Sequence, residues 1–169
     1  MKKICVLLAC VCLAFALVGC GEAEYLRIHI RAHSNASADQ AVKLAVRDAI
    51  VDHLTPLLQG RSSLAQAVRV AEDNADELGR IATAVLQDSG FSYGASVRVS
   101  REFFPTRAYG DLTLASGVYD ALIVELGSAQ GDNWWCIAYP PLCFGGGGKA
   151  QVKSWIWERL AELFEARRV

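Results

Sequence analysis

The N-terminal segment sets the strongest limit on this 169-residue chain, because it decides how much of the chain is left to fold. Lys2 and Lys3 precede an uninterrupted run of apolar or small residues from Ile4 to Val18. That run suits the apolar region of a signal peptide and is short for a membrane span, which needs about twenty residues. We therefore predict an exported protein whose residues 1–20 are a signal peptide.

The cysteine that ends this segment predicts how the protein is anchored. Leu17-Val18-Gly19-Cys20 resembles the lipobox, at which bacterial lipoproteins are cleaved and lipidated. We predict lipidation of Cys20, which would hold the protein on the outer face of the cytoplasmic membrane. Two alternatives stay open: an ordinary secretory signal cut near Ala23, which would give a secreted soluble protein, and a retained membrane anchor.

The remainder of the chain has the length of one domain. Residues 21–24 would be a short linker, and residues 25–169 are enough to build a single core. The whole chain carries 17 Lys and Arg against 18 Asp and Glu. This balance argues against a nucleic-acid partner, because phosphate binding needs a basic surplus or patch.

The six cysteines divide between the signal peptide and the domain. The first three would leave with the signal peptide, and Cys20 is the predicted lipid site. Cys136 and Cys143 remain as an even pair in an exported domain, where a disulfide would close an eight-residue loop. Two buried free thiols are the alternative, and a redox pair is disfavoured because the spacing is not C-x-x-C.

Apolar patterns predict the element order β-α-α-β-β-β-α. The expected strands are 25–32, 95–103, 118–126 and 134–139, and the expected helices are 37–54, 64–87 and 151–167. Strict alternation marks the first strand, in which Arg27, His29 and Arg31 would form a polar outer face. Serines that begin the first two helices, Ser37 and Ser63, each have a glutamine three residues later, as in a capping box.

These elements predict an α+β domain, in which an about four-stranded, largely antiparallel sheet packs with three helices. The last three strands would form an antiparallel meander, and the 25–32 strand would add beside them. The helices would cover one face of the sheet. Residues 104–117 would be a long connector, and the four glycines at 145–148 a flexible loop.

Catalytic and metal-binding residues do not have the spacing that known motifs require. His29 and His33 would lie on a strand and in a turn, with no third ligand evident. Ser34 and His53 could be combined with an acid, but no G-x-S-x-G motif supports a nucleophile. The glycines at 145–148 lack the P-loop pattern that cradles phosphate. We predict no catalytic residues, no metal and no cofactor.

Two adjacent tryptophans are the best candidates for binding a partner. Trp134 and Trp135 would point to opposite faces of a strand. One ring could fill the core, and the other could stand outside, where a large rigid ring favours a protein interface. The alternative is that the 104–117 connector covers both rings.

Several segments taken together resemble one known family. They are Leu26-Arg27-Ile28, Ala32-His33-Ser34-Asn35, Phe104–Gly110, Gly117–Leu122, Asn133-Trp134-Trp135-Cys136 and Pro140-Pro141-Leu142-Cys143-Phe144. The pattern is similar to stage II sporulation protein R of endospore-forming bacteria, and it extends over nearly all of the exported region.

The resemblance implies signalling rather than catalysis. Members of the family are made in the forespore and exported into the space between the forespore and mother-cell membranes. There they activate a membrane-embedded aspartic protease that processes the pro-sigma-E factor. The implied partners are therefore this protease and, through lipid on Cys20, the outer face of the forespore membrane that faces the intermembrane space.

We expect the protease to be bound by a patch formed from the 134–144 segment and the 104–110 loop. The candidate partner-binding residues are Ser34, Asn35, Arg107, Tyr109, Trp134, Trp135 and Phe144. Two other functions stay open. One is an envelope lipoprotein that binds a small ligand or a cell-wall fragment through the same aromatic patch, and the other is a cell-wall hydrolase.

Overall fold

The computed structural model describes residues 25–140. The elements are β1 (Leu26–Arg31), α2 (Ser37–Leu58), α3 (Leu64–Asp73), α4 (Ala75–Asp88), β2 (Ala95–Phe104), β3 (Arg107–Tyr109), β4 (Leu112–Leu114), β5 (Gly117–Leu126) and β6 (Asn133–Tyr139). The predicted signal peptide, the glycine loop at 145–148 and the predicted helix at 151–167 lie outside the described residues.

The long strands form one mixed sheet with the order β2-β5-β1-β6. β1 pairs with β5 in parallel and with β6 in antiparallel fashion, and β2 is antiparallel to β5. The α+β class and the largely antiparallel sheet are therefore confirmed. The predicted meander is wrong, because β1 lies between β5 and β6 instead of beside them.

β1 occupies the centre of the sheet because both of its faces are buried. Leu26, Ile28 and Ile30 are 0% exposed and belong to the core beneath the helices. On the other face Arg27 is also 0% exposed, and His29 is 5% exposed. The alternation predicted for this strand is confirmed, but its polar face is covered and does not face solvent.

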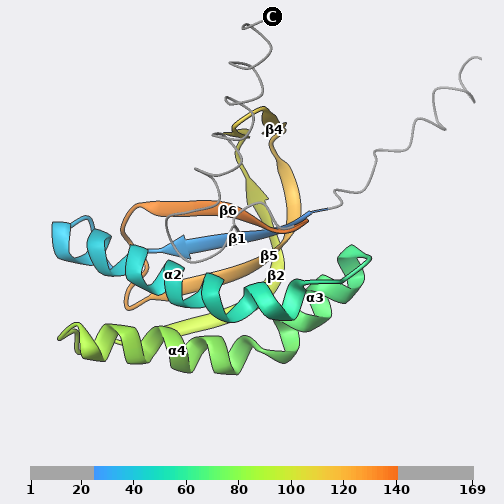
Figure 1. Cartoon of the computed structure of the whole chain (residues 1–169). Helices are drawn as coiled ribbons and strands as arrows, with labels where there is room; N and C mark the ends of the chain where they lie inside the picture. Colours follow the sequence, from blue (N-terminus) through green and yellow to red (C-terminus); the bar gives the residue numbers. More distant parts are fainter. Residues whose placement is uncertain (1–24, 141–169) are drawn as a thin grey trace, which may run out of the picture.

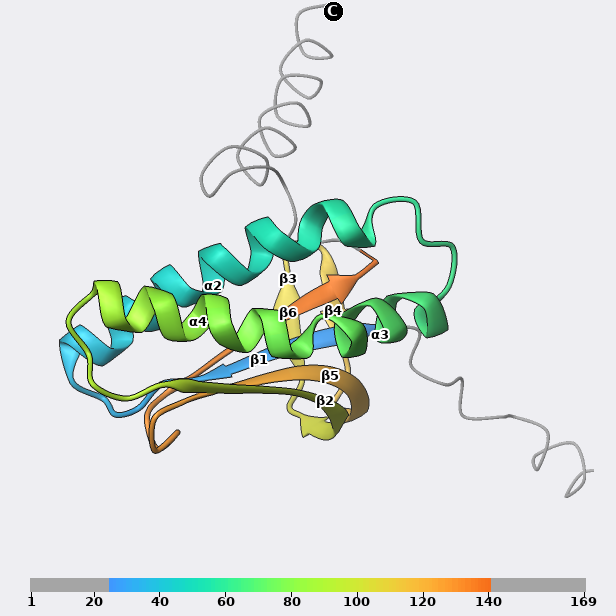
Figure 2. The same cartoon turned by 90° about the horizontal axis from the view of Figure 1, so that it is seen from below.

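The helices cover one face of the sheet, below it in Figure 1, and α2 and α4 run side by side in Figure 2. The predicted helix 64–87 is interrupted at Asn74, whose side chain donates a hydrogen bond to the Val70 carbonyl (2.8 Å). Ser63 caps α3 as predicted by accepting from the Gln66 amide, whereas α2 begins at Ser37 without a side-chain cap. Within the described residues, no helix is both long and apolar enough to cross a bilayer.

The connector between β2 and β5 contains a hairpin that the sequence analysis did not predict. β3 pairs with β4, and the chain turns at Gly110, whose φ of 60° is a left-handed conformation that glycine adopts without steric cost. The two strands form a separate small sheet. Figure 1 shows this β3–β4 hairpin above the main sheet, on the side away from the helices.

Replacing Leu54 by alanine should lower the free energy of unfolding by about 2–5 kcal/mol, because the side chain is fully buried in the core and its loss leaves a cavity. The matched control is Leu44→Ala on the same helix. Leu44 is 40% exposed, so its truncation should change the free energy by less than about 1 kcal/mol. Urea denaturation measures both, and equal losses would contradict this position of the core.

Candidate functional site

The outer face of the sheet carries a cluster built around the buried Arg27. Its Nε donates to the Cys136 carbonyl oxygen (3.1 Å), and its Nη2 donates to the Tyr109 hydroxyl (2.6 Å). The guanidinium carbon lies 4.4 Å from the centre of the Phe104 ring and 5.0 Å from that of Tyr119. All four strands of the sheet and the β3–β4 hairpin therefore contribute to enclosing one cation among aromatic rings.

His29 and Trp135 extend this cluster across β1 and β6. They lie opposite each other in the strand register, with ring centres 5.3 Å apart. The Arg107 guanidinium carbon, from the hairpin, lies 4.1 Å from the centre of the Trp135 ring. His29 also contacts Phe104, and Arg27 bonds Tyr109, so these residues form one connected cluster. We call this cluster the hairpin site; its members are Arg27, His29, Phe104, Arg107, Tyr109 and Trp135.

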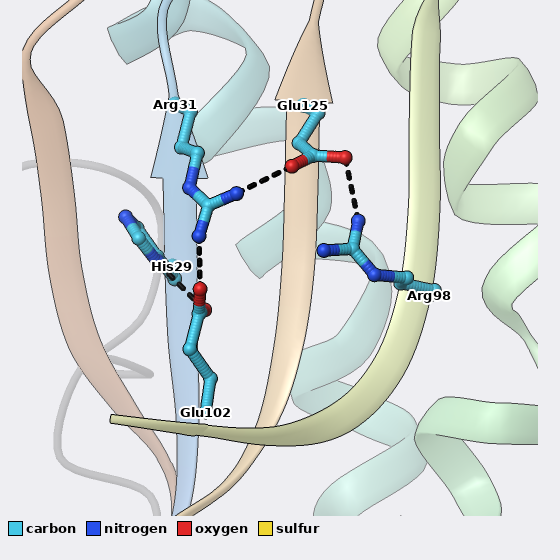
Figure 3. Close-up of polar contacts among 5 residues, drawn as sticks. All are labelled: His29, Arg31, Arg98, Glu102 and Glu125. Carbon is cyan, nitrogen blue, oxygen red and sulfur yellow. Dashed lines mark hydrogen bonds and ion pairs between the residues drawn. The ribbon is translucent and has the colours of Figure 1, made fainter. Parts of the chain in front are cut away.

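A chain of ion pairs runs beside the hairpin site across β1, β5 and β2 (Figure 3). Glu102 accepts from His29 Nδ1 (2.8 Å) and from Arg31, and Glu125 accepts from Arg31 and Arg98 at 2.5 Å each. The hydrogen bond from Arg98 and the charge of both arginines hold the pKa of Glu125 below its ordinary value, against the effect of burial. Each of these two carboxylates is therefore already shared by two basic side chains.

Ser34 and Asn35 lie at the other end of β1, where they join two loops. Ser34 donates to the carboxylate of Asp39, which also accepts from the Tyr93 hydroxyl (2.5 Å). The Asn35 side-chain oxygen accepts from the Asp132 amide (2.6 Å). This bond ties the β1–α2 turn to the β5–β6 loop, so both predicted contact residues are bonded within the chain.

Lys43 and Gly131 hold the same two loops together. The Lys43 ammonium donates to the Gln40 side chain (2.6 Å) and to the Asp132 carbonyl (2.9 Å), and burial lowers the pKa of this amine. A Cβ on Gly131 would lie 2.3 Å from the carbonyl oxygen of Ser34. We call this end of the domain, formed by residues 34–43 and 131–132, the loop clamp.

The predicted contact patch is therefore divided. Arg107, Tyr109 and Trp135 meet in the hairpin site as predicted residues of one patch. Trp134 lies on the helix side, where the Arg47 guanidinium carbon is 5.6 Å from its ring centre. The loop clamp lies beyond the end of β1 that is away from Arg27, so Ser34 and Asn35 are not part of the hairpin site.

Three predicted site residues cannot be placed in this way. Cys20, Cys143 and Phe144 lie outside the described residues. Cys136 is buried on β6, at 7% exposure. Lipidation of Cys20, pairing of Cys136 with Cys143 and the role of Phe144 in binding therefore stay predictions.

The residues that the structure describes place the candidate metal-binding and catalytic side chains of the sequence analysis. Among residues 25–140, no three His, Cys, Asp or Glu side chains gather as a metal site requires. His29 pairs with Glu102 on the outer face, whereas His33 stacks on Tyr93 at 4.3 Å between ring centres. Ser34 precedes α2 and His53 lies near its end, roughly 25 Å along the helix, so these two do not form a nucleophile–base pair.

The sequence analysis did not name Arg27 or His29 as members of the site, and it included Phe104 only as the first residue of the 104–110 loop. Arg27 and His29 alternate with apolar residues, which is typical of a strand that is half exposed. No local signal marks Arg27 as buried, because the groups that enclose it come from residues far along the chain. Phe104 is the last residue of β2, a strand that the sequence analysis ended one residue earlier.

Fold and site together define an α+β domain in which two arginines pack against aromatic rings on the sheet face that the helices leave uncovered. A family model described as stage II sporulation protein R matches residues 22–147. The chain is also 34% identical, over 121 residues, to Stage II sporulation protein R of Bacillus subtilis (strain 168). These matches identify a protein of bacterial sporulation. The chain belongs to the stage II sporulation protein R family, which confirms the resemblance in its sequence.

The match to the Bacillus subtilis protein extends over only part of that protein. The aligned region covers 72% of this chain and 54% of the Bacillus subtilis protein, so the chain spans about half the length of the curated relative it matches. No solved structure matches the chain.

The loop clamp predicts a dependence of stability on acid pH. Hydrogen bonds from Ser34 and Tyr93 lower the pKa of Asp39 in the folded state. A carboxylate with a lowered folded pKa stabilises the fold above its unfolded pKa of about 3.9, and this stability is lost as pH falls through the folded value. We expect the thermal midpoint to fall below about pH 4, and Asp39→Asn to lower the midpoint at pH 7 and to reduce that acid-dependent fall.

The matched control is Asp52→Asn, because Asp52 is an exposed aspartate of the same helix. It should retain the acid profile of the wild-type protein. Thermal unfolding followed by circular dichroism between pH 2.5 and 7 measures all three proteins. An Asp39→Asn profile that parallels the wild type would contradict the role of this carboxylate.

Proposed function

We propose that this protein is an exported signalling protein that activates a membrane-embedded aspartic protease, which then processes the pro-sigma-E factor of sporulation. The family match over residues 22–147 carries the proposal. The signal-like residues 1–20 support it, because a protein that acts on a receptor in another membrane must leave the compartment in which it is made. In this proposal the domain works by binding and carries out no reaction.

Lipid on Cys20 would set how far this domain reaches. β1 begins six residues after Cys20, and a fully extended segment of that length spans roughly 20 Å. In this proposal the domain stays close to the outer face of the forespore membrane and meets its receptor across a narrow intermembrane space.

The β3–β4 hairpin, with the half-buried Arg107, Tyr109 and Trp135, forms the contact surface of the proposal. Tryptophan, tyrosine and arginine supply most of the energy at protein interfaces, and here Arg107, Tyr109 and Trp135 lie together. Phe103 and Val118 lie opposite each other on β2 and β5, next to the hairpin along the chain, and are 64% and 50% exposed. Because successive side chains on a strand point to opposite faces, they point away from Phe104 and Tyr119 and do not belong to the hairpin surface.

Activation follows from differential binding. A ligand shifts a receptor between an inactive and an active state only by the difference between its affinities for the two states. The proposal therefore requires that the hairpin surface fit the active state of the protease better than the inactive state. A rigid sheet that presents this surface reduces the ordering cost of binding.

Reconstitution in a non-sporulating host tests the function. The protease and its sigma-factor precursor are coexpressed with and without the full chain, and cleavage of the precursor is measured by immunoblot. The wild-type protein should raise the cleaved fraction. No increase would overturn the proposed function.

Variants in the same host test the surface. Arg107→Ala and Trp135→Ala should each lower activation about tenfold or more, because loss of an interface hot spot costs about 2 kcal/mol. Arg80→Ala is the matched control, since Arg80 is exposed on α4, where it bonds Glu77 of the same helix. If the precursor is cleaved to the wild-type extent with each hairpin-site variant, at equal protein levels, this contact surface is excluded and the proposed function is left in place.

A further inference from the structure

The hairpin site contains four buried nitrogen atoms that have no hydrogen-bond partner among the described residues. They are Arg27 Nη1, His29 Nε2, Arg107 Nε and Trp135 Nε1. Buried polar atoms are nearly always paired, because an unpaired one has lost its bonds to water without replacing them. The one other such side-chain atom of the described residues is on His53 in α2, so the unpaired atoms are concentrated in this site.

The two arginines of the site also lack a carboxylate partner within residues 25–140. The glutamates of the adjacent ion-pair chain are taken by other basic side chains. The bonds of Arg27 go to the neutral oxygens of Tyr109 and Cys136, and Arg107 lies against the Trp135 ring. Aromatic faces attract a cation, but they do not replace the counter-charge that a buried guanidinium needs.

We propose that the hairpin site binds a carboxylate group, held by Arg27 Nη1, Arg107 Nε and Trp135 Nε1. All three are obligate donors, and the two oxygens of a carboxylate together accept about four hydrogen bonds. The negative charge of the group also supplies the missing counter-charge, which a neutral carbonyl does not. His29 is not counted as a donor, because its Nδ1 already bonds Glu102 and a hydrogen on Nε2 would require a second ring proton.

Entry of the ligand requires the β3–β4 hairpin to move, because the nitrogen atoms are closed to solvent. The hairpin forms its own two-stranded sheet and pairs with no strand of the main sheet. It is held over the site by side chains, among them Tyr109 on Arg27 and Arg107 on Trp135. Lifting it therefore breaks side-chain contacts and no backbone ladder of the main sheet.

The carboxylate can come from an aspartate or glutamate side chain of a protein or from a free small carboxylate, since the chemistry that the site recognises is the same. The inference concerns this chemistry and does not depend on which protein is the receptor.

Thermal unfolding of the purified protein tests the site. The protein is produced by expressing the full sequence in a host that exports it. The probes are sodium acetate, the peptide acetyl-Gly-Glu-Gly-amide and its glutamine counterpart, with sodium chloride keeping the ionic strength constant. Acetate and the glutamate peptide should raise the midpoint saturably, because a ligand that binds only the folded state stabilises it. The glutamine peptide and chloride should not. If the glutamate peptide binds more tightly than acetate, the carboxylate comes from a protein side chain. If the two bind equally, it comes from a free small carboxylate.

Variants separate this site from general effects of charge. Arg107→Gln should raise the dissociation constant for acetate about tenfold or more, because it removes a charge-assisted hydrogen bond. Arg98→Gln is the matched control: Arg98 lies on the same face but already pairs with Glu125, so this variant should bind as the wild type does. Trp135→Phe, which removes Nε1 and keeps an aromatic ring, should also weaken binding and serves if Arg107→Gln does not fold.

The proposal is overturned if acetate raises the midpoint no more than chloride does. It is equally overturned if the folded Arg107→Gln and Trp135→Phe proteins bind acetate as tightly as the wild type. No protease is present in this experiment. A failure here therefore leaves the proposed function standing, and a failure of the reconstitution leaves the carboxylate site standing.

Discussion

The burial of Arg27 in a central strand imposes the arrangement of the outer sheet face. A guanidinium that is 0% exposed cannot be solvated, so the chain itself must surround it. Carbonyl and hydroxyl oxygens from β6 and β3 accept its hydrogen bonds, and rings from β2 and β5 cover its faces. The connector between β2 and β5 must therefore fold back over the sheet, which explains why a hairpin stands there instead of an open loop.

The same residue shows how far the sequence could predict the fold. Alternation correctly identified β1, because Leu26, Ile28 and Ile30 all face the helices. Alternation could not place β1 between β5 and β6, since Arg27 and His29 are typical of a face turned to solvent. The groups that bury Arg27 lie 82 and 109 residues further along the chain. No local pattern records pairings at that distance, and the strand order depends on them.

The candidate site was predicted in part for a related reason. Trp135 was recognised by residue type, because large aromatic groups are common at interfaces, whereas Arg107 and Tyr109 were named because they lie in a segment that carries the family resemblance. Ser34 and Asn35 were assigned polar contacts to a partner because they belong to a segment that carries the family resemblance. Short polar side chains in turns commonly bond nearby backbone or loop groups, and here they hold the loop clamp together.

The two ends of β1 therefore differ in what a partner could gain there. At the loop clamp the polar groups are paired, so a partner would have to displace existing bonds before making its own. At the hairpin site the free protein already bears the cost of unpaired nitrogens and of a guanidinium without a counter-charge. A group that fits them makes new bonds and relieves that cost in one step. Binding energy is thus most readily gained beneath the hairpin, which pairs with no strand of the main sheet and contacts the site through its side chains.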